Sequence, residues 1–272
     1  ARNLTMTAVS SNQSLLPNGS ITVGGAPPAW TSSDIGSVTT SGNLTEDFGT
    51  YLVGGTGAGI GPAAGDAYRW VRQSFTGDAE VIARVVSVDH SNQSSEAGLM
   101  MRESTAATSR FAYVRVSASE GVSFLHRATG STDAVVTASL PLASTPCWLR
   151  LVREGNGYTA FYATDNDGTA GAWQAVGTEQ TISFSGSTHD IGMAVSNHVD
   201  TTGCTAVFYH LGGSVLTGGE RTLLLTPAAG QTGSTTLTLT ASDGAQTSQT
   251  SFNVEVVGGA PPSTTVWNAA AT

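Results

Sequence analysis

The sequence predicts an all-β protein built from two β-sandwiches, and three observations lead to this prediction. The 272 residues include 38 Thr and 31 Ser, so 69 carry a hydroxyl, and Gly supplies another 33. Strong helix formers are scarce, because charged residues make up only 11% and Lys is absent. Apolar and polar residues alternate along most of the chain, interrupted by Gly, Asn and Asp, which is typical of short strands joined by tight turns.

The middle of the chain contains the clearest strands, and it is rich in aromatic residues such as Trp70, Trp148 and Trp173. Their number and regular spacing indicate a sandwich of two sheets. The strands expected here are Ala67–Gln73, Glu80–Val88, Ala97–Arg102, Phe111–Ser117, Val122–Arg127, Trp148–Arg153, Tyr158–Ala163, Asp190–Ser196 and Thr205–Leu211.

The two ends of the chain differ from the middle and resemble each other. Their strands consist of Thr, Leu and Val with few aromatic residues, and each end closes with the string Val-Gly-Gly-Ala-Pro-Pro, which marks a domain exit. We therefore expect one domain to be split around another. The expected strands are Leu4–Val9, Ser20–Val23, Arg221–Thr226, Ser234–Ala241 and Ser251–Val257. The expected domains are residues 1–25 with 213–258, residues 29–212, and a linker of residues 259–272.

The charge balance excludes several partners. Asp and Glu number 20 against 11 Arg, a formal net charge of −9, whereas a nucleic-acid partner would require a basic surplus. No apolar run approaches the roughly 18 residues of a membrane span. A surface that is polar through hydroxyls rather than charges is typical of secreted proteins, so we expect an extracellular or cell-surface location.

Six short strings follow one another along the middle domain, and together they resemble a bacterial secreted family of concanavalin-A/laminin-G-like jelly rolls. The resemblance implies a two-sheet, lectin-like jelly roll that serves as a module of large extracellular proteins. It implies no catalytic residues, and the Glu-x-Asp-x-x-Glu motif of jelly-roll glycosidases is absent. The strings are Ser33-Asp34-Ile35-Gly36, Gly65-Asp66-Ala67-Tyr68, Gly77-Asp78-Ala79-Glu80, residues 97–104, residues 147–151 and residues 192–198.

The flanks contain strings at residues 8–17, 21–25, 221–233 and 241–244 that resemble one bacterial immunoglobulin/cadherin-like repeat cut in two. The resemblance implies an incomplete immunoglobulin-like Greek-key sandwich with the jelly roll inserted in one of its turns. Such repeats begin with one or two strands upstream of residue 4, which this chain lacks. A sandwich without its first strands has an unpaired edge that tends to recruit a strand.

The tail of the chain is a candidate for that strand. Thr265, Trp267, Ala269 and Ala271 alternate onto one face, with Val266 on the other. Donated to a neighbouring copy, the tail would form a head-to-tail contact that propagates into a filament. The alternative is that the tail is the beginning of another domain in a longer chain.

In the middle domain, aromatic and Arg side chains alternate onto the same faces of strands, as in the pairs Trp70 with Arg72, Tyr113 with Arg115, and Trp148 with Arg150. Such faces predict a glycan site. Aromatic rings stack on sugars, while guanidinium groups bind hydroxyls or acids. The alternative is that the rings belong to the core and the Arg side chains extend to the rim. The residues expected to bind glycan are Trp70, Arg72, Tyr113, Arg115, His126 and Arg150.

Cys147 and Cys204 are the two cysteines, and each precedes an expected strand. They could form one disulfide or remain buried free thiols, because the sequence cannot supply their separation.

No cofactor is expected, because the five His residues are scattered without metal-ligand spacing. Asp165-Asn166-Asp167-Gly168 is similar to part of a calcium loop but lacks the distal Glu, and a hairpin turn is the alternative. A Ca²⁺ site built elsewhere from backbone carbonyls remains open.

The sequence lacks a Gly-x-Ser-x-Gly elbow, a phosphate loop and a His-Glu-x-x-His string, so no enzymatic activity is expected. The leading hypothesis is an extracellular subunit of a self-assembling surface filament that displays a lectin-like domain to glycans. The alternative is a carbohydrate-binding module of a larger secreted adhesin or glycan-degrading enzyme.

Overall fold

The computed structural model describes residues 5–23, 30–47, 49–89, 92–141, 143–199, 201–213, 223–242 and 246–257. Apart from a short 3-10 helix, η1 (Asn18–Ser20), every regular element in these residues is a strand, which confirms the all-β class. In the part of the chain that the structure describes, no helix is long and apolar enough to cross a membrane.

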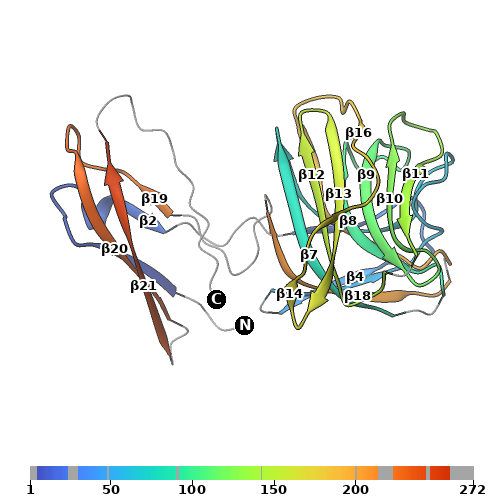
Figure 1. Cartoon of the computed structure of the whole chain (residues 1–272), viewed down its shortest axis with the longest axis horizontal. Coiled ribbons are helices and arrows are strands. Elements are labelled where there is room, and N and C mark those ends of the chain that lie inside the picture. Colours follow the sequence, from blue (N-terminus) through green and yellow to red (C-terminus); the bar gives the residue numbers. More distant parts are fainter. Residues whose placement is uncertain are drawn as a thin grey trace. The chain divides into compact units, whose positions relative to one another are not determined.

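The chain divides into two compact units, residues 28–217 and residues 1–27 with 218–272 (Figure 1). The strings that mark the expected domain exits lie outside the described residues. The domain boundaries expected from the sequence therefore stay a prediction.

The larger unit is a jelly-roll sandwich of two antiparallel sheets. Its first sheet has seven strands in the order β11-β10-β9-β8-β17-β6-β3. These strands are β3 (Thr31–Ile35), β6 (Tyr68–Thr76), β8 (Glu96–Arg102), β9 (Phe111–Ser117), β10 (Gly121–Arg127), β11 (Val135–Leu140) and β17 (Thr188–Ser196).

The second sheet follows the order β14-β13-β12-β7-β18-β5-β4, with two short strands, β15 and β16, added to β13. Its strands are β4 (Asn43–Asp47), β5 (Thr50–Gly55), β7 (Ala79–Val88), β12 (Cys147–Glu154), β13 (Gly157–Asn166), β14 (Thr169–Ala170), β15 (Gln174–Ala175), β16 (Gln180–Thr181) and β18 (Cys204–Gly213).

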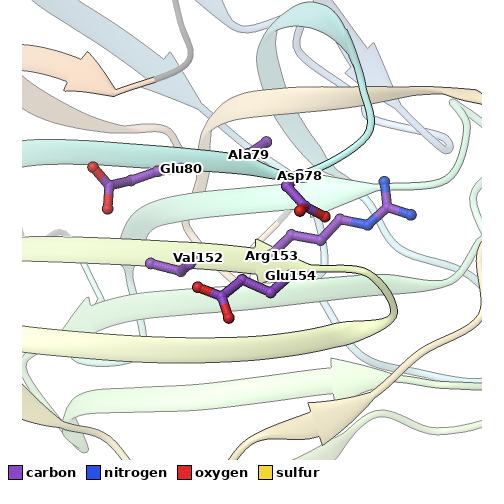
Figure 2. Close-up of a pocket in the computed structure, with 6 residues that line it drawn as sticks. All are labelled: Asp78, Ala79, Glu80, Val152, Arg153 and Glu154. Carbon is purple, nitrogen blue, oxygen red and sulfur yellow. The ribbon is translucent and has the colours of Figure 1, made fainter.

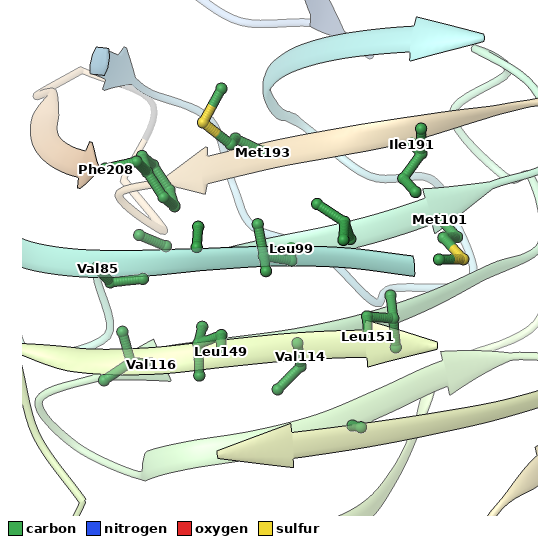
Figure 3. Close-up of a cluster of buried hydrophobic side chains, with 14 of the residues drawn as sticks. Val85, Leu99, Met101, Val114, Val116, Leu149, Leu151, Ile191, Met193 and Phe208 are labelled. Atoms are coloured by element: carbon green, nitrogen blue, oxygen red, sulfur yellow. The ribbon is translucent and has the colours of Figure 1, made fainter. Parts of the chain in front are cut away.

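The main core lies between the two sheets, and Figure 3 shows part of it. Alternate residues of each strand point inward, as the two-residue period of a strand requires. Leu99 of β8 and Val114 of β9 thus pack with Leu149 of β12 and Phe208 of β18. On β7 the inward residues are buried while several outward residues are half-buried, so this sheet keeps one accessible face.

The centre of the first sheet is buried on both faces, since β8 and β9 are buried at every position. A second apolar cluster covers the side that faces away from the main core. Ile60, from the connection between β5 and β6, joins this cluster, and so do partly buried Ala107 and Ala134. The strand residues of the cluster are Ile35, Tyr68, Trp70, Met100, Phe111, Tyr113, Leu125 and Ala194.

A buried ion cluster holds these covering segments in place. The Asp66 carboxylate receives two hydrogen bonds of 2.8 Å from Arg127 and lies 2.7 Å from Nη1 of Arg102. All three side chains have no exposed surface. The two guanidinium groups also donate to carbonyls of Pro62, Ser104, Ala106, Ala107, Ser109 and Thr132 in the covering segments.

Cys147 and Cys204 are buried free thiols, so the disulfide considered from the sequence is wrong. Cys147 lies on β12 and Cys204 on β18, and β7 runs between these strands. Two strand spacings alone separate the Cα atoms by about 9.5 Å. A disulfide requires less than about 7 Å.

Residues 165–168 form the hairpin turn between β13 and β14, in which Asn166 pairs with Thr169. The central residues Asp167 and Gly168 have φ values of 50° and 88°, as a two-residue hairpin loop requires. Among the described residues, no group of three or more His, Cys, Asp or Glu is placed to hold a metal ion.

The smaller unit has a three-stranded sheet, β1-β20-β21, and a two-stranded sheet, β19-β2. The core of this unit is formed by Leu16, Leu223, Leu237 and Leu239. The strands are β1 (Thr5–Ser10), β2 (Ile21–Val23), β19 (Leu223–Leu225), β20 (Gly233–Ser242) and β21 (Thr247–Val256).

The immunoglobulin-like topology of the smaller unit stays a prediction. The proposed donor strand lies outside the described residues; it consists of Thr265, Val266, Trp267, Ala269 and Ala271.

Replacing Asp66 by Asn should lower the free energy of unfolding by about 3–5 kcal/mol, because two buried guanidinium groups lose their counter-charge. Urea unfolding followed by tryptophan fluorescence measures this change. Glu46→Gln, at an exposed position, is the control and should stay within about 0.5 kcal/mol of wild type. An equally small effect of Asp66→Asn would show that the ion cluster does not hold the covering segments.

Ellman's reagent should detect no thiol in the folded protein and two thiols in denaturant. Burial raises the pKa of Cys147 and of Cys204 to about 12, so neither forms the reactive thiolate near neutral pH. An intact mass lower by two hydrogens, with no thiol released by denaturant, would contradict the separation of the two strands.

Candidate functional site

The six residues predicted to bind glycan do not come together in one site. Trp70 of β6 and Tyr113 of β9 share a face of the first sheet, as their strand phase predicts, but neither side chain is exposed. A ring covered on both sides cannot stack on a sugar. In this structure the two rings therefore belong to the core, as the alternative interpretation held.

Arg72 and Arg115 lie on the same face, and each forms ion pairs with acidic side chains. Nε of Arg72 lies 3.3 Å from Oδ2 of Asp190, and the Arg115 guanidinium contacts Glu96 and Glu120. Arg115 is only 5% exposed. These ion pairs leave little guanidinium surface for a ligand.

His126 and Arg150, the remaining two, lie on different sheets. Nδ1 of His126 lies 3.1 Å from Oγ1 of Thr137 on β11, and partial burial lowers the pKa of this imidazole. Arg150 is on β12, where its side chain extends from the accessible outer face of the second sheet and is 30% exposed.

Arg150 is the centre of an aromatic cluster that we call the Arg150 patch, formed by Glu80, Arg150, Phe161 and Trp173. Phe161 lies directly opposite Arg150 on β13, and its ring centroid is 4.9 Å from the guanidinium carbon. β15 pairs with β13 and so brings the preceding Trp173 ring to 6.0 Å. Glu80 of β7 accepts a 2.6 Å hydrogen bond from Nε of Arg150.

A shallow hollow of about 350 Å³ adjoins this patch, and Figure 2 shows Glu80 at one end of it. Glu80 therefore belongs both to the Arg150 patch and to the hollow. The lining residues are Asp78, Ala79, Glu80, Val152, Arg153 and Glu154.

A second aromatic cluster lies on the same sheet, and we call it the His210 patch. The His210 ring stacks on Trp148 with 5.5 Å between centroids and 23° between planes, and Tyr209 meets it edge-on at 4.1 Å. Arg84 donates two hydrogen bonds, of 2.6 and 2.7 Å, to the Asp165 carboxylate, which also accepts 2.9 Å from Nε1 of Trp148.

An irregularity in β18 presents the two exposed rings of this patch. The register with β7 shifts between Tyr209 and Gly212, and His210 has a φ of 50°, in the left-handed region. A bulge of this kind turns a side chain that regular pleating would point inward toward the outer face. Tyr209 and His210 are consecutive residues, yet both are exposed.

The two patches combine aromatic rings with hydrogen-bonded ion pairs. The carboxylates of Glu80 and Asp165 accept hydrogen bonds from Arg150 and Arg84. What the face offers is ring surface together with paired charges that can donate to and accept from hydroxyl groups.

Sequence reasoning identified Arg150 and its shared phase with Trp148, but it missed the other members of both patches. Phe161 could have been found, because it lies centrally in an expected strand and alternates onto the outer face. Trp173 and His210 carried no such signal, since one precedes a two-residue strand and the other depends on a bulge.

No family model matches the sequence, and no curated protein matches it either. A functionally unknown protein from Saccharomyces cerevisiae aligns with 70% of this chain and 97% of its own, at 12% identity and a TM-score of 0.52. The carbohydrate binding module CBM66 from Bacillus subtilis covers the same shares at 17% identity and a TM-score of 0.44. A lichenase derived from a mouse hindgut metagenome aligns with 75% of this chain and 96% of its own, at 12% identity and a TM-score of 0.40. The likeness to the Saccharomyces cerevisiae protein, at 12% identity, shows the fold alone.

Acid should weaken the fold through Asp165. Hydrogen bonds from Arg84, and further ones from Gly168 and Trp148, outweigh partial burial and lower the pKa of Asp165 from 3.8 to about 2. Because the folded pKa is the lower one, this stabilisation is complete above about pH 4 and is lost as pH falls toward 2. Urea unfolding from pH 7 to pH 2 should show this loss.

Asp165→Asn should reduce that pH dependence and lower the free energy of unfolding at pH 7 by about 1–3 kcal/mol, since Arg84 loses a charged partner. Asp167→Asn removes the same charge two residues away and should leave the Arg84 pair intact. If the two variants lose stability with the same pH profile, the Arg84–Asp165 pair is not responsible.

Proposed function

We propose that the larger unit is a carbohydrate-binding module that uses the outer face of its second sheet. The observation that carries this proposal is the Arg150 patch, where two aromatic rings flank an Arg–Glu pair on an accessible sheet. Sugars present both apolar C–H faces and hydroxyl groups. Rings bind the former, and a charge pair can both donate to and accept from the latter.

The surface chemistry of the chain supports a neutral ligand outside the cell. The protein has a formal net charge of −9, which repels polyanions, and both Arg residues of the two patches are already neutralised by acids. We further propose that the module is secreted and acts by binding without catalysis.

Assembly into a filament by strand donation stays a separate prediction. Its proposed donor strand lies outside the described residues, and the binding proposal does not depend on it.

The proposal is tested with the full chain on a glycan array and by sedimentation with insoluble cellulose, xylan and mixed-linkage glucan. Wild type should bind at least one neutral glycan. Trp173→Ala and Phe161→Ala should each weaken binding about tenfold or more, because each removes a stacking ring from the patch.

Val136→Ala is the matched control, since Val136 is 50% exposed but lies on β11 of the other sheet. It should bind as wild type does. Absence of binding to every glycan, or equal binding by all the variants, would overturn the proposed function.

A further inference from the structure

The Arg150 patch and the His210 patch lie on the same face of four neighbouring strands. Phe161 of β13 pairs with Arg150 of β12. Two residues away on β12, Trp148 pairs with Arg84 of β7, and Arg84 also pairs with Tyr209 of β18. Both patches therefore belong to one continuous surface that crosses β13, β12, β7 and β18.

The span of this surface exceeds one sugar ring. Three strand spacings, about 14 Å, separate Phe161 on β13 from Tyr209 on β18. Along β12, Trp148 and Arg150 are two residues apart, about 6.6 Å. A ligand that touches both patches must be an extended molecule lying obliquely across the strands.

Stability alone does not account for the His210 patch. A non-glycine residue in the left-handed region is strained, yet His210 holds this conformation at an exposed position. The adjacent Tyr209 ring is 36% exposed rather than packed in the core. Strain that leaves two rings in solvent is typical of residues kept for contact with a ligand.

The support beneath the exposed rings is rigid. Trp148 is only 8% exposed, and its indole and the Arg84 guanidinium both bond the carboxylate of Asp165, whose side chain is 6% exposed. The His210 ring lies flat on this support, and the residue is exposed. A preorganised ring of this kind can receive the apolar face of a sugar at little entropic cost.

We infer that the two patches are subsites for one neutral polysaccharide chain, with several sugar units bound side by side across β13, β12, β7 and β18. The inference rests on the proposed carbohydrate-binding function and extends it from a single contact to a chain. The ligand is neutral because Arg150 pairs with Glu80 and Arg84 with Asp165, so neither patch holds a spare positive charge for an acidic sugar.

The experiment measures affinity by calorimetry against the neutral series that binds on the array (cello-, xylo- or mixed-linkage gluco-oligosaccharides), from the monosaccharide to the hexasaccharide. Wild type should gain affinity steeply with length until both patches are spanned. His210→Gly removes the ring while permitting the same backbone conformation, so folding stability should be equal or higher. This variant should bind the shortest ligands as wild type does and lose about tenfold or more against the longest.

Trp173→Ala, in the other patch, is the matched comparison and should weaken binding at every length. Equal affinity of wild type and His210→Gly for the longest ligands would overturn the second subsite while the proposed function stands. Failure of every oligosaccharide and polysaccharide to bind would overturn both. Reversible self-association of wild type that His210→Gly and Tyr209→Ala abolish would instead make this face an interface between copies.

Discussion

The carboxylate of Asp66 is the contact on which the architecture of the larger unit depends. It lies between Arg102 of β8 and Arg127 of β10 with no exposed surface, and both guanidinium groups also bind carbonyls of the covering segments. A buried carboxylate is tolerated only when it is fully paired, so the segments must stay closed to keep it so. Their closure buries Trp70 and Tyr113 and makes the centre of the first sheet a core layer that is buried on both sides.

Among the described residues, no segment covers the two patches of the second sheet in this way. Glu80, Arg150 and Phe161 remain half-buried on its outer face, and their contacts are cross-strand pairs within the sheet. Side chains on adjacent strands are held by the backbone ladder itself, which positions them more rigidly than loops would. The outer face of the second sheet is therefore the face on which we place the proposed ligand site.

Local alternation in the sequence predicted nine strands of the larger unit and which of their residues share a face, but it missed β3, β4, β5 and β11. One face of the first sheet carries Trp70, Arg72, Tyr113 and Arg115, as predicted. The outer face of the second sheet carries Trp148 and Arg150. What alternation cannot specify is which face a distant segment will cover. Ile60 reaches the Trp70 cluster through the fold of residues 56–67, and strand periodicity contains no information on that contact.

The same limit explains why the sequence could not settle the disulfide or predict the His210 patch. Both cysteines precede expected strands, but only the strand order shows that β7 separates them. In the sequence, His210 is an ordinary residue of an alternating strand. In the structure, a register shift turns its side chain outward. Tertiary strand order and local irregularity lie beyond the sequence pattern.

The few basic side chains of this protein are used in such contacts. Arg is its only strong base, and the Arg residues of both sheets are paired with acids or bonded to carbonyls. The planar guanidinium group suits this use, because it binds a carboxylate through two parallel bonds and stacks on rings at the same time. Arg84 binds both carboxylate oxygens of Asp165 in this way, whereas Arg150 contacts one oxygen of Glu80 and lies over the Phe161 ring. A lysine ammonium would hold the acid as a point charge but would leave the rings without a planar partner, so the proposed binding surface requires Arg here.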